Sequence, residues 1–130
     1  MPKQLKLHML EEKFCISKLP QFAELPHIFT RGELCFVART EDELSIISPE
    51  FMAPTNVQQE TGWRCFRIDG TVSMKESGMI AAVTQPLAEA NIGTFVISTF
   101  NTDYFFIMEE NLIKATQALQ HAGHEFVHKE

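Results

Sequence analysis

Hydrophobic and polar residues alternate over residues 65–69, Cys-Phe-Arg-Ile-Asp, and this period of two is typical of a β-strand with one buried face. A polar stretch follows, and apolar residues then recur at helical spacing, at Met79, Ile80, Val83, Leu87 and Ala90. This spacing predicts a helix over residues 79–90, with Ser77 as its N-cap. We expect the helix to bend at Pro86, because the proline nitrogen carries no hydrogen to donate.

Two strands are predicted next along the chain. Asn91 and Gly93 end the helix, and residues 94–100 are rich in β-branched and aromatic side chains, which favour a strand. A short polar turn at residues 101–102 leads into residues 103–108, Asp-Tyr-Phe-Phe-Ile-Met. This almost wholly apolar run is typical of a central strand.

A second helix and a last strand complete the pattern. Apolar positions over residues 112–122 line one helical face, with Asn111 as the cap and Gly123 just past the end. Residues 124–128 alternate again. The order over residues 65–128 is therefore β-α-β-β-α-β, the ferredoxin-like plan of an α+β fold, with both helices on one face of a four-stranded antiparallel sheet. The other face needs a cover, either a second such unit or a partner chain.

The first half of the chain supplies a reduced copy of this unit. Residues 35–47 and 94–107 both read as two strands joined by a polar turn. With one gap, Phe36, Val37, Thr40 and Ile47 fall on Phe95, Val96, Thr99 and Ile107. The chain between the first two strands is shorter in this copy and is bracketed by Pro20 and Pro26, which leaves room for only about a turn. We expect a reduced N-terminal subdomain over residues 1–60 and a complete domain over residues 61–130.

Composition and charge exclude several classes of protein. The chain has 130 residues, 45% of them hydrophobic, and a formal net charge of -6. An acidic chain without a basic stripe repels phosphate backbones, so we expect no nucleic-acid partner. The N-terminus lacks the apolar core of a signal peptide, and no apolar run is long enough to span a bilayer. We therefore expect a cytoplasmic protein with no membrane association.

No residue pattern indicates catalysis. The three cysteines, Cys15, Cys35 and Cys65, are odd in number and form no Cys-x-x-Cys pair, which is typical of reduced thiols. The sequence holds no P-loop, no nucleophile elbow and no dinucleotide fingerprint. Three histidines have a spacing open to metal binding or to simple solvent exposure: His121, His124 and His128. We expect no enzyme, no cofactor and no metal.

Three stretches carry a resemblance to a known family: GWRCFRIDG, SGMIAAVTQPLAEANI and FVISTFNTDYFFI. They resemble the small tandem ACT-domain proteins, and the same domain type occurs in a cytosolic arginine sensor of animals. The resemblance implies binding of an amino acid or a similar metabolite at an interface between two ACT domains. It implies contacts from the loop before the first helix, at Glu76, Ser77, Gly78, Met79 and Ile80. By similarity to the arginine sensor, it also implies contacts from the turn between the next two strands, at Thr99, Phe100, Asn101, Thr102 and Asp103.

The chemistry of these residues agrees with such a ligand. Gly78 allows the backbone a close approach, and the unpaired amides at a helix start suit a carboxylate. Asp103 could pair with an ammonium group. The chain lacks the Asp-x-Pro-Gly sequence that many ACT domains carry in this loop, and Glu76 would repel a carboxylate unless it points away or the ligand brings a positive group. Ser77 could instead serve only as a cap, and Thr99, Asn101 and Asp103 could serve only to form the turn.

These observations favour a ligand-binding regulatory module that acts through a partner protein or through its own assembly, with a homodimer expected. The alternatives are a structural module of the same fold that binds no ligand, and a small ferredoxin-like enzyme.

Overall fold

The computed structural model describes residues 3–30, 34–70 and 76–127, and these residues divide into two units. One unit combines Met1–Glu11 with Arg64–Glu130, and the other is Glu12–Trp63. We call them the outer and the inner unit, because the second is inserted between the two parts of the first along the chain. The boundary between Trp63 and Arg64 falls close to the one expected between residues 60 and 61. Residues 1–11, however, group with the C-terminal part of the chain and not with the N-terminal subdomain that the sequence predicted.

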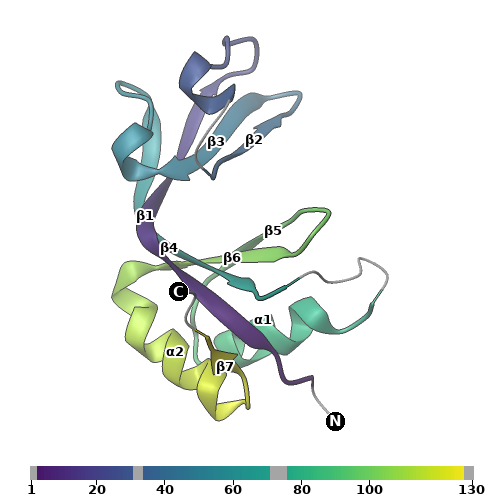
Figure 1. Ribbon diagram of the computed structural model, residues 1–130. Coiled ribbons are helices and arrows are strands. Elements are labelled where there is room, and N and C mark those ends of the chain that lie inside the picture. The colour runs from purple at the N-terminus through teal and green to yellow at the C-terminus, as the bar shows by residue number, and fades with distance from the viewer. Residues whose placement is uncertain (1–2, 31–33, 71–75, 128–130) are drawn as a thin grey trace. The chain divides into compact units, whose positions relative to one another are not determined.

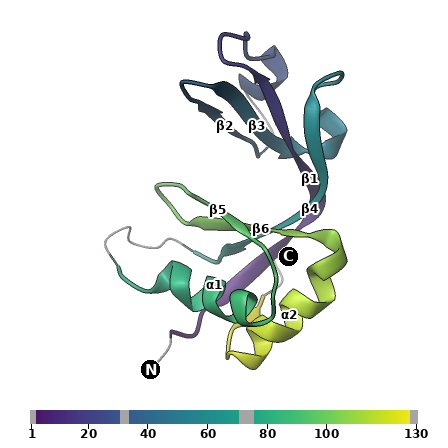
Figure 2. The ribbon, with the colours of Figure 1, turned by 180° about the vertical axis from the view of Figure 1, so that it is seen from behind.

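The outer unit follows the predicted order of strands and helices. Its sheet has the strand order β7-β1-β4-β6-β5, and Figures 1 and 2 show both of its α-helices on one side of β4, β5 and β6. The element bounds are β1 Lys6–Pro20, β4 Gln58–Ile68, α1 Met79–Glu89, β5 Phe95–Ser98, β6 Asp103–Met108, η3 Glu109–Asn111, α2 Leu112–His121 and β7 Glu125–Phe126. Strands β1 and β4 are long, and each contributes one part to each unit.

The sheet of the outer unit differs from the predicted four-stranded antiparallel sheet. The first residues of β1 form an additional strand between β7 and β4, and β7 pairs with β1 in parallel, with Lys6 opposite Glu125 and Leu7 opposite Phe126. Backbone bonds fix this strand on both sides, since the amide of Asp69 donates to the carbonyl of Lys6 at 2.8 Å and that of Val127 donates to the carbonyl of Leu7 at 2.7 Å. Leu7 is fully buried, so the insertion also adds to the core.

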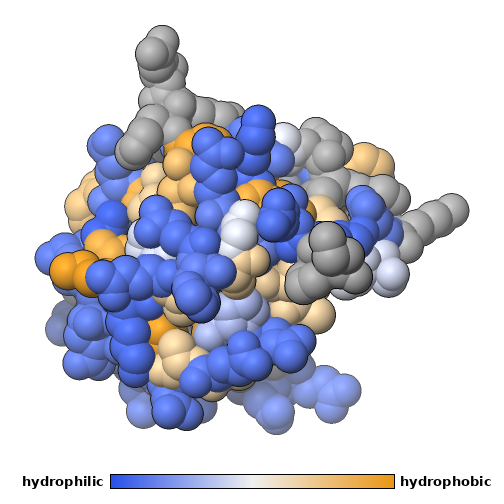
Figure 3. Space-filling model, turned by 90° about the horizontal axis from the view of Figure 1, so that it is seen from below, coloured by the Kyte–Doolittle hydropathy of each residue, from blue (hydrophilic) through white to orange (hydrophobic). Residues whose placement is uncertain are grey.

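Apolar faces of the two helices and the sheet form the core of the outer unit. Phe66 and Phe105 stack at a centroid distance of 5.2 Å, against Val83 and Leu87 of α1 and Leu119 of α2. All five side chains are fully buried. Figure 3, viewed from the side on which the helices lie in Figure 1, shows a mainly hydrophilic surface with separate apolar residues.

Backbone conformation sets the helix ends. Gly78 is the N-cap of α1 with φ 85°, and no side chain caps the helix, so the prediction of Ser77 as the cap is wrong. A left-handed residue is needed at this point, and glycine adopts that conformation without strain. Asn91 (φ 61°) and Gly123 (φ 100°) follow the two helices in the left-handed region that ends many helices, as predicted. Asn111 is the N-cap of α2 but makes no capping bond.

Pro86 lies inside α1, as predicted, and its missing amide is replaced from outside the helix. The carbonyl of Ala82 would normally accept from residue 86, four positions on. Instead, Nε2 of His124 lies 2.7 Å from that carbonyl, while Nδ1 of His124 accepts from the amide of Leu5 at 3.1 Å. Because a carbonyl can only accept, Nε2 carries the proton. His124 is buried and joins the chain ahead of β1 to the middle of α1.

The inner unit uses the same strand plan with shorter connections. Its sheet has the order β4-β1-β3-β2, and its core contains Leu19, Phe29, Leu44, Ile46 and Met52. The elements between the long strands are η1 His27–Thr30, β2 Phe36–Arg39, β3 Glu43–Pro49 and η2 Glu50–Met52. Among its described residues, single 3₁₀ turns stand where the outer unit has α-helices. The short turn that the sequence predicted between Pro20 and Pro26 lies just ahead of η1.

The two hairpins β2–β3 and β5–β6 have the same register. Phe36 lies opposite Ile47, and Phe95 lies opposite Phe106. Ile47 therefore corresponds in position to Phe106 and not to Ile107, so the gap introduced in the sequence comparison is unnecessary.

Candidate functional site

A small hollow lies at the start of α1 in the outer unit, where the predicted ligand site begins. Its volume is about 190 Å³. Three elements provide its walls: the segment before α1, the first turn of α1, and the paired ends of β5 and β6. The lining residues are Glu76, Gly78, Met79, Ile80, Ala81, Ser98 and Asp103. Pockets for drug-sized ligands typically measure about 300–1,000 Å³, so this one suits a smaller molecule.

The backbone of α1 makes part of this hollow suitable for a negative group. The first bond within the helix runs from the amide of Ala82 to the carbonyl of Gly78, at 3.0 Å. The amides of residues 79–81 come before that bond and have no partner inside the helix. Their direction and the positive end of the helix dipole favour an anion such as a carboxylate.

Two carboxylates give the hollow a second, opposite preference. Asp103 is half-buried at the start of β6, and the hydroxyl of Ser98 donates to its Oδ1 at 2.5 Å. Glu76 stands just before the helix, and Nζ of Lys3 donates to its Oε1 at 2.7 Å. A molecule that carries both a carboxylate and a positive group could therefore meet complementary partners within this one hollow.

The structure brings together half of the predicted site residues. Glu76, Gly78, Met79, Ile80 and Asp103 line the hollow. The other five, Ser77, Thr99, Phe100, Asn101 and Thr102, do not line it. Thr102 is buried, and its hydroxyl donates to the carbonyl of Ile68 at 2.8 Å, which ties the hairpin turn to the end of β4. The hydroxyl of Thr99 donates to the carbonyl of Thr102 at 3.1 Å, while Phe100 is 86% exposed at the tip of the turn.

Three residues at or beside this hollow were not predicted as site residues from the sequence. Ala81 simply continues the first turn of α1. Ser98 could have been found, because antiparallel pairing across a four-residue turn places it opposite Asp103. Lys3 could not, since nothing in its local sequence indicates that residues near the start of the chain join the sheet of the outer unit.

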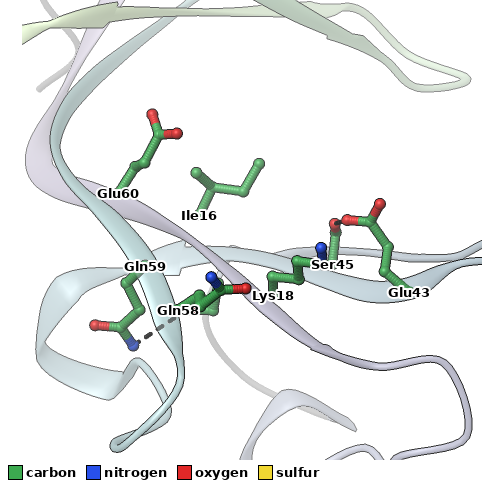
Figure 4. A pocket seen from close by; sticks show the side chains of 8 residues that line it. Ile16, Lys18, Glu43, Ser45, Gln58, Gln59 and Glu60 are labelled. Atoms are coloured by element: carbon green, nitrogen blue, oxygen red, sulfur yellow. Dashed lines mark hydrogen bonds between the residues drawn. The ribbon is translucent and has the colours of Figure 1, made fainter.

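A larger hollow lies in the inner unit, on β1, β3 and β4, with a volume of about 450 Å³. Figure 4 shows its lining side chains, which are mostly polar and come from Ile16, Ser17, Lys18, Glu43, Ser45, Gln58, Gln59 and Glu60. The hydroxyl of Ser45 donates to the carboxylate of Glu43, and Nε2 of Gln59 donates to Oγ of Ser17 at 3.2 Å. Lys18, Gln58 and Glu60 are exposed. We interpret this hollow as a solvated sheet face, because most of its lining side chains are polar and several of them are exposed.

Thiols and histidines do not form a chemical site in the described part of the chain. Burial raises the pKa of the Cys15 thiol above 9.0, and it also raises the pKa of Cys35, so both are protonated at neutral pH. Both ring nitrogens of His124 are used in structural bonds, and His121 is exposed at the end of α2. His128 lies outside the described residues. No group of three or more potential metal ligands occurs among residues 3–30, 34–70 and 76–127.

Hydropathy gives one further result for the helices. Within the described residues, neither α1 nor α2 is long and apolar enough to cross a membrane.

Comparison with protein families now identifies the class of protein. Residues 58–121 match the family model described as ACT domain, and this range contains both helices and the whole lining of the hollow. This part of the chain belongs to the ACT-domain family, as the sequence resemblance indicated.

Particular relatives share part of the sequence. Over 59 residues the chain is 37% identical to proteins of Homo sapiens and Bos taurus named cytosolic arginine sensor for mTORC1 subunit 1. The match covers 45% of this chain and 18% of the relative, so the chain spans less than a fifth of these relatives' length.

Solved structures extend the likeness to the whole chain. A protein of Agrobacterium tumefaciens matches with a TM-score of 0.90 and 31% identity, covering 98% of this chain and 96% of the other. The regulatory subunit of aspartate kinase from Thermus thermophilus matches with a TM-score of 0.61 and 10% identity, covering 89% of this chain and 96% of the subunit. The second likeness, at this low identity, is one of fold alone.

Proposed function

We propose that this chain is a regulatory module that binds an amino acid in the hollow at the start of α1. The observation that carries this proposal is that one hollow of about 190 Å³ is lined both by the first turn of α1, whose amides have no partner in the helix, and by the carboxylates of Glu76 and Asp103. An α-amino acid carries a carboxylate and an ammonium group on the same carbon. Its carboxylate could bind the helix amides while its ammonium group binds a carboxylate of the hollow.

The ACT family and the regulatory character of several relatives support a small-molecule-binding regulatory module rather than an enzyme. The relatives named as arginine sensors make arginine the first candidate ligand. Two carboxylates also favour a ligand with a positive side chain over a neutral one. In this proposal the hairpin turn beside the hollow forms a rim, from which the exposed Phe100 could extend over a bound ligand.

We further propose that the two units are tandem ACT-type halves, the inner one reduced. The equal strand order, the equal hairpin register and the replacement of helices by 3₁₀ turns support this view. Regulation would pass to a partner protein or to a second copy of the chain, because a ligand shifts an equilibrium only between states that it binds differently.

Calorimetric titration with L-arginine tests the proposal. Asp103→Asn keeps the shape of the side chain and removes its charge, so we expect L-arginine to bind at least about tenfold more weakly, since a charged hydrogen bond contributes roughly 1.5–3 kcal/mol. Asp42→Asn, in the corresponding turn of the inner unit, is the matched control and should leave the affinity unchanged. Equal loss in both variants, or no stabilisation of the wild-type protein by any amino acid in a thermal-shift screen, would favour the structural module.

A further inference from the structure

Lys3 is held at the edge of the hollow by a well-defined backbone. Two residues further on, the amide of Leu5 donates to His124 and its carbonyl accepts from Glu125 at 2.9 Å. The carbonyl of Lys6 accepts from Asp69. The chain is thus fixed on both sides immediately after Lys3, which limits where the lysine side chain can reach.

The side chain of Lys3 lies across the start of α1. Its Cε would be 3.8 Å from a Cβ atom placed on Gly78, and its Nζ is 2.7 Å from Oε1 of Glu76. Gly78 and Glu76 both line the hollow. The ammonium group of Lys3 therefore forms an ion pair with Glu76, which is one of the two carboxylates to which a positive group of a ligand could bind.

We propose that Lys3 is a specificity-determining residue of this site, an intramolecular cation that competes for Glu76 with cationic groups of the ligand. This inference rests on the function proposed above. While Lys3 is in place, Asp103 is the only carboxylate of the hollow's lining without a cation on it among the described contacts. The lysine thereby reduces the advantage of a ligand with a charged side chain over a neutral one of similar size.

The expected size of this effect follows from the exposure of the pair. The side chains of Lys3 and Glu76 are 36% and 48% exposed, so water and salt screen their attraction. Ion pairs of this kind change an equilibrium by up to about fivefold. The competition therefore adjusts the choice between ligands and does not close the site.

Titrations of the full chain with L-arginine and L-glutamine test the role of Lys3. Lys3→Met should raise the affinity for L-arginine by up to about fivefold and leave that for L-glutamine unchanged. Lys6→Met removes the same charge three residues away, from an exposed side chain of β1, and should leave the ratio of the two affinities as in the wild type. In a Glu76→Gln background, Lys3→Met should no longer change the ratio.

A measurement without ligand separates this inference from the proposed function. Amide resonances of Gly78 and Met79 should move in Lys3→Met and stay in place in Lys6→Met. If they stay in place in both, the ion pair does not form and the inference is overturned. Binding of the probes with an unchanged affinity ratio overturns the role of Lys3 alone. Absence of binding in all variants overturns the site, and the role of Lys3 with it.

Discussion

The hairpins β2–β3 and β5–β6 have the same backbone design in two different units. In each, four residues that begin with threonine lie between the last two residues that pair across the hairpin. The amide of that threonine donates to the carbonyl of the fourth residue, at 2.8 Å from Thr40 to Glu43 and 2.9 Å from Thr99 to Thr102. The threonine hydroxyl also accepts from the fourth amide in both turns, at 3.2 and 3.4 Å. The turn is therefore a shared scaffold and does not by itself create a site.

The residues that close the strands next to these turns are different. The inner unit has Arg39 opposite Leu44, and the outer unit has Ser98 opposite Asp103. The guanidinium group of Arg39 donates to the carbonyls of Gln21 and Ala23, in the segment that follows β1. In the outer unit the corresponding pair, Ser98 and Asp103, lines a hollow, and Asp103 presents a carboxylate to it.

This difference explains why we place a ligand site in one unit only. In the inner unit the strand end is occupied by the chain's own cation, and a 3₁₀ turn offers fewer free amides than an α-helix. In the outer unit the helix and the carboxylate are both available. Two hairpins of the same register thus differ in the side chains that they offer to a ligand.

Truncation of the two cores is the strongest test of the division into units. Leu119→Ala in the outer core and Leu44→Ala in the inner core each remove a fully buried side chain, and each should cost about 2–5 kcal/mol. Both α-helices lie in the outer unit, so far-UV circular dichroism reports mainly on it, while the single tryptophan, Trp63, reports on the inner unit. We expect each variant to lower mainly the urea transition of its own unit. Equal shifts of both signals in both variants would mean that the two units unfold as one.

Loss of His124 should have the next largest effect, confined to the outer unit. His124→Ala leaves the carbonyl of Ala82 and the amide of Leu5 without these bonds, at a cost of about 2–4 kcal/mol in the free energy of unfolding measured by circular dichroism. Pro86→Ala returns an amide to the helix, so the cost of losing His124 should fall by about 1 kcal/mol in that background. His121→Ala, at an exposed position, is the control and should change stability by less than about 0.5 kcal/mol. An unchanged cost in the Pro86→Ala background would contradict the bond to Ala82.

The smallest effect tests the equivalence of the turns. Thr40→Ala and Thr99→Ala each remove a hydroxyl that bonds within its turn, and each should cost about 0.5–1.5 kcal/mol, in the inner and the outer unit respectively. Urea unfolding followed by the two signals measures both. A cost for one threonine and none for the other would show that the turns differ in energy despite their equal geometry.

Much of the outer unit could be predicted because its pattern is local. Helical spacing and strand alternation located α1, β5, β6 and α2 to within a few residues, and the left-handed Gly123 ended α2 where expected. The additional strand at Lys6 and Leu7 could not be predicted, since it pairs with residues more than a hundred positions away through backbone groups that have no sequence signature. The prediction of Ser77 as the N-cap is wrong because the next residue, Gly78, takes that position with a left-handed backbone.

The kinds of chemical group at the site could be predicted from the sequence better than the identity of the residues that line it. Gly78 and Asp103 were expected in one site, and both line the hollow, since one precedes a helix and the other begins a strand beside a turn. Thr102 is buried instead, because its hydroxyl donates to the carbonyl of Ile68 at the end of β4. The pattern of turn residues alone does not predict that this end of β4 lies beside the turn. His124 was considered only as a metal ligand or a solvated residue, although the missing amide of Pro86 already implied that some donor must reach Ala82.

The pairing of β1 with β7 also bears on how the protein is made. Lys6 meets Glu125, so the sheet of the outer unit stays open until nearly all of the chain described here has left the ribosome. The inner unit needs only residues 12–63, which are synthesised long before that point. Contacts between distant residues form slowly, and domains generally fold as their chain emerges. The unit inserted in the middle of the chain can thus fold first and hold β1 and β4, the two strands around which the later unit closes.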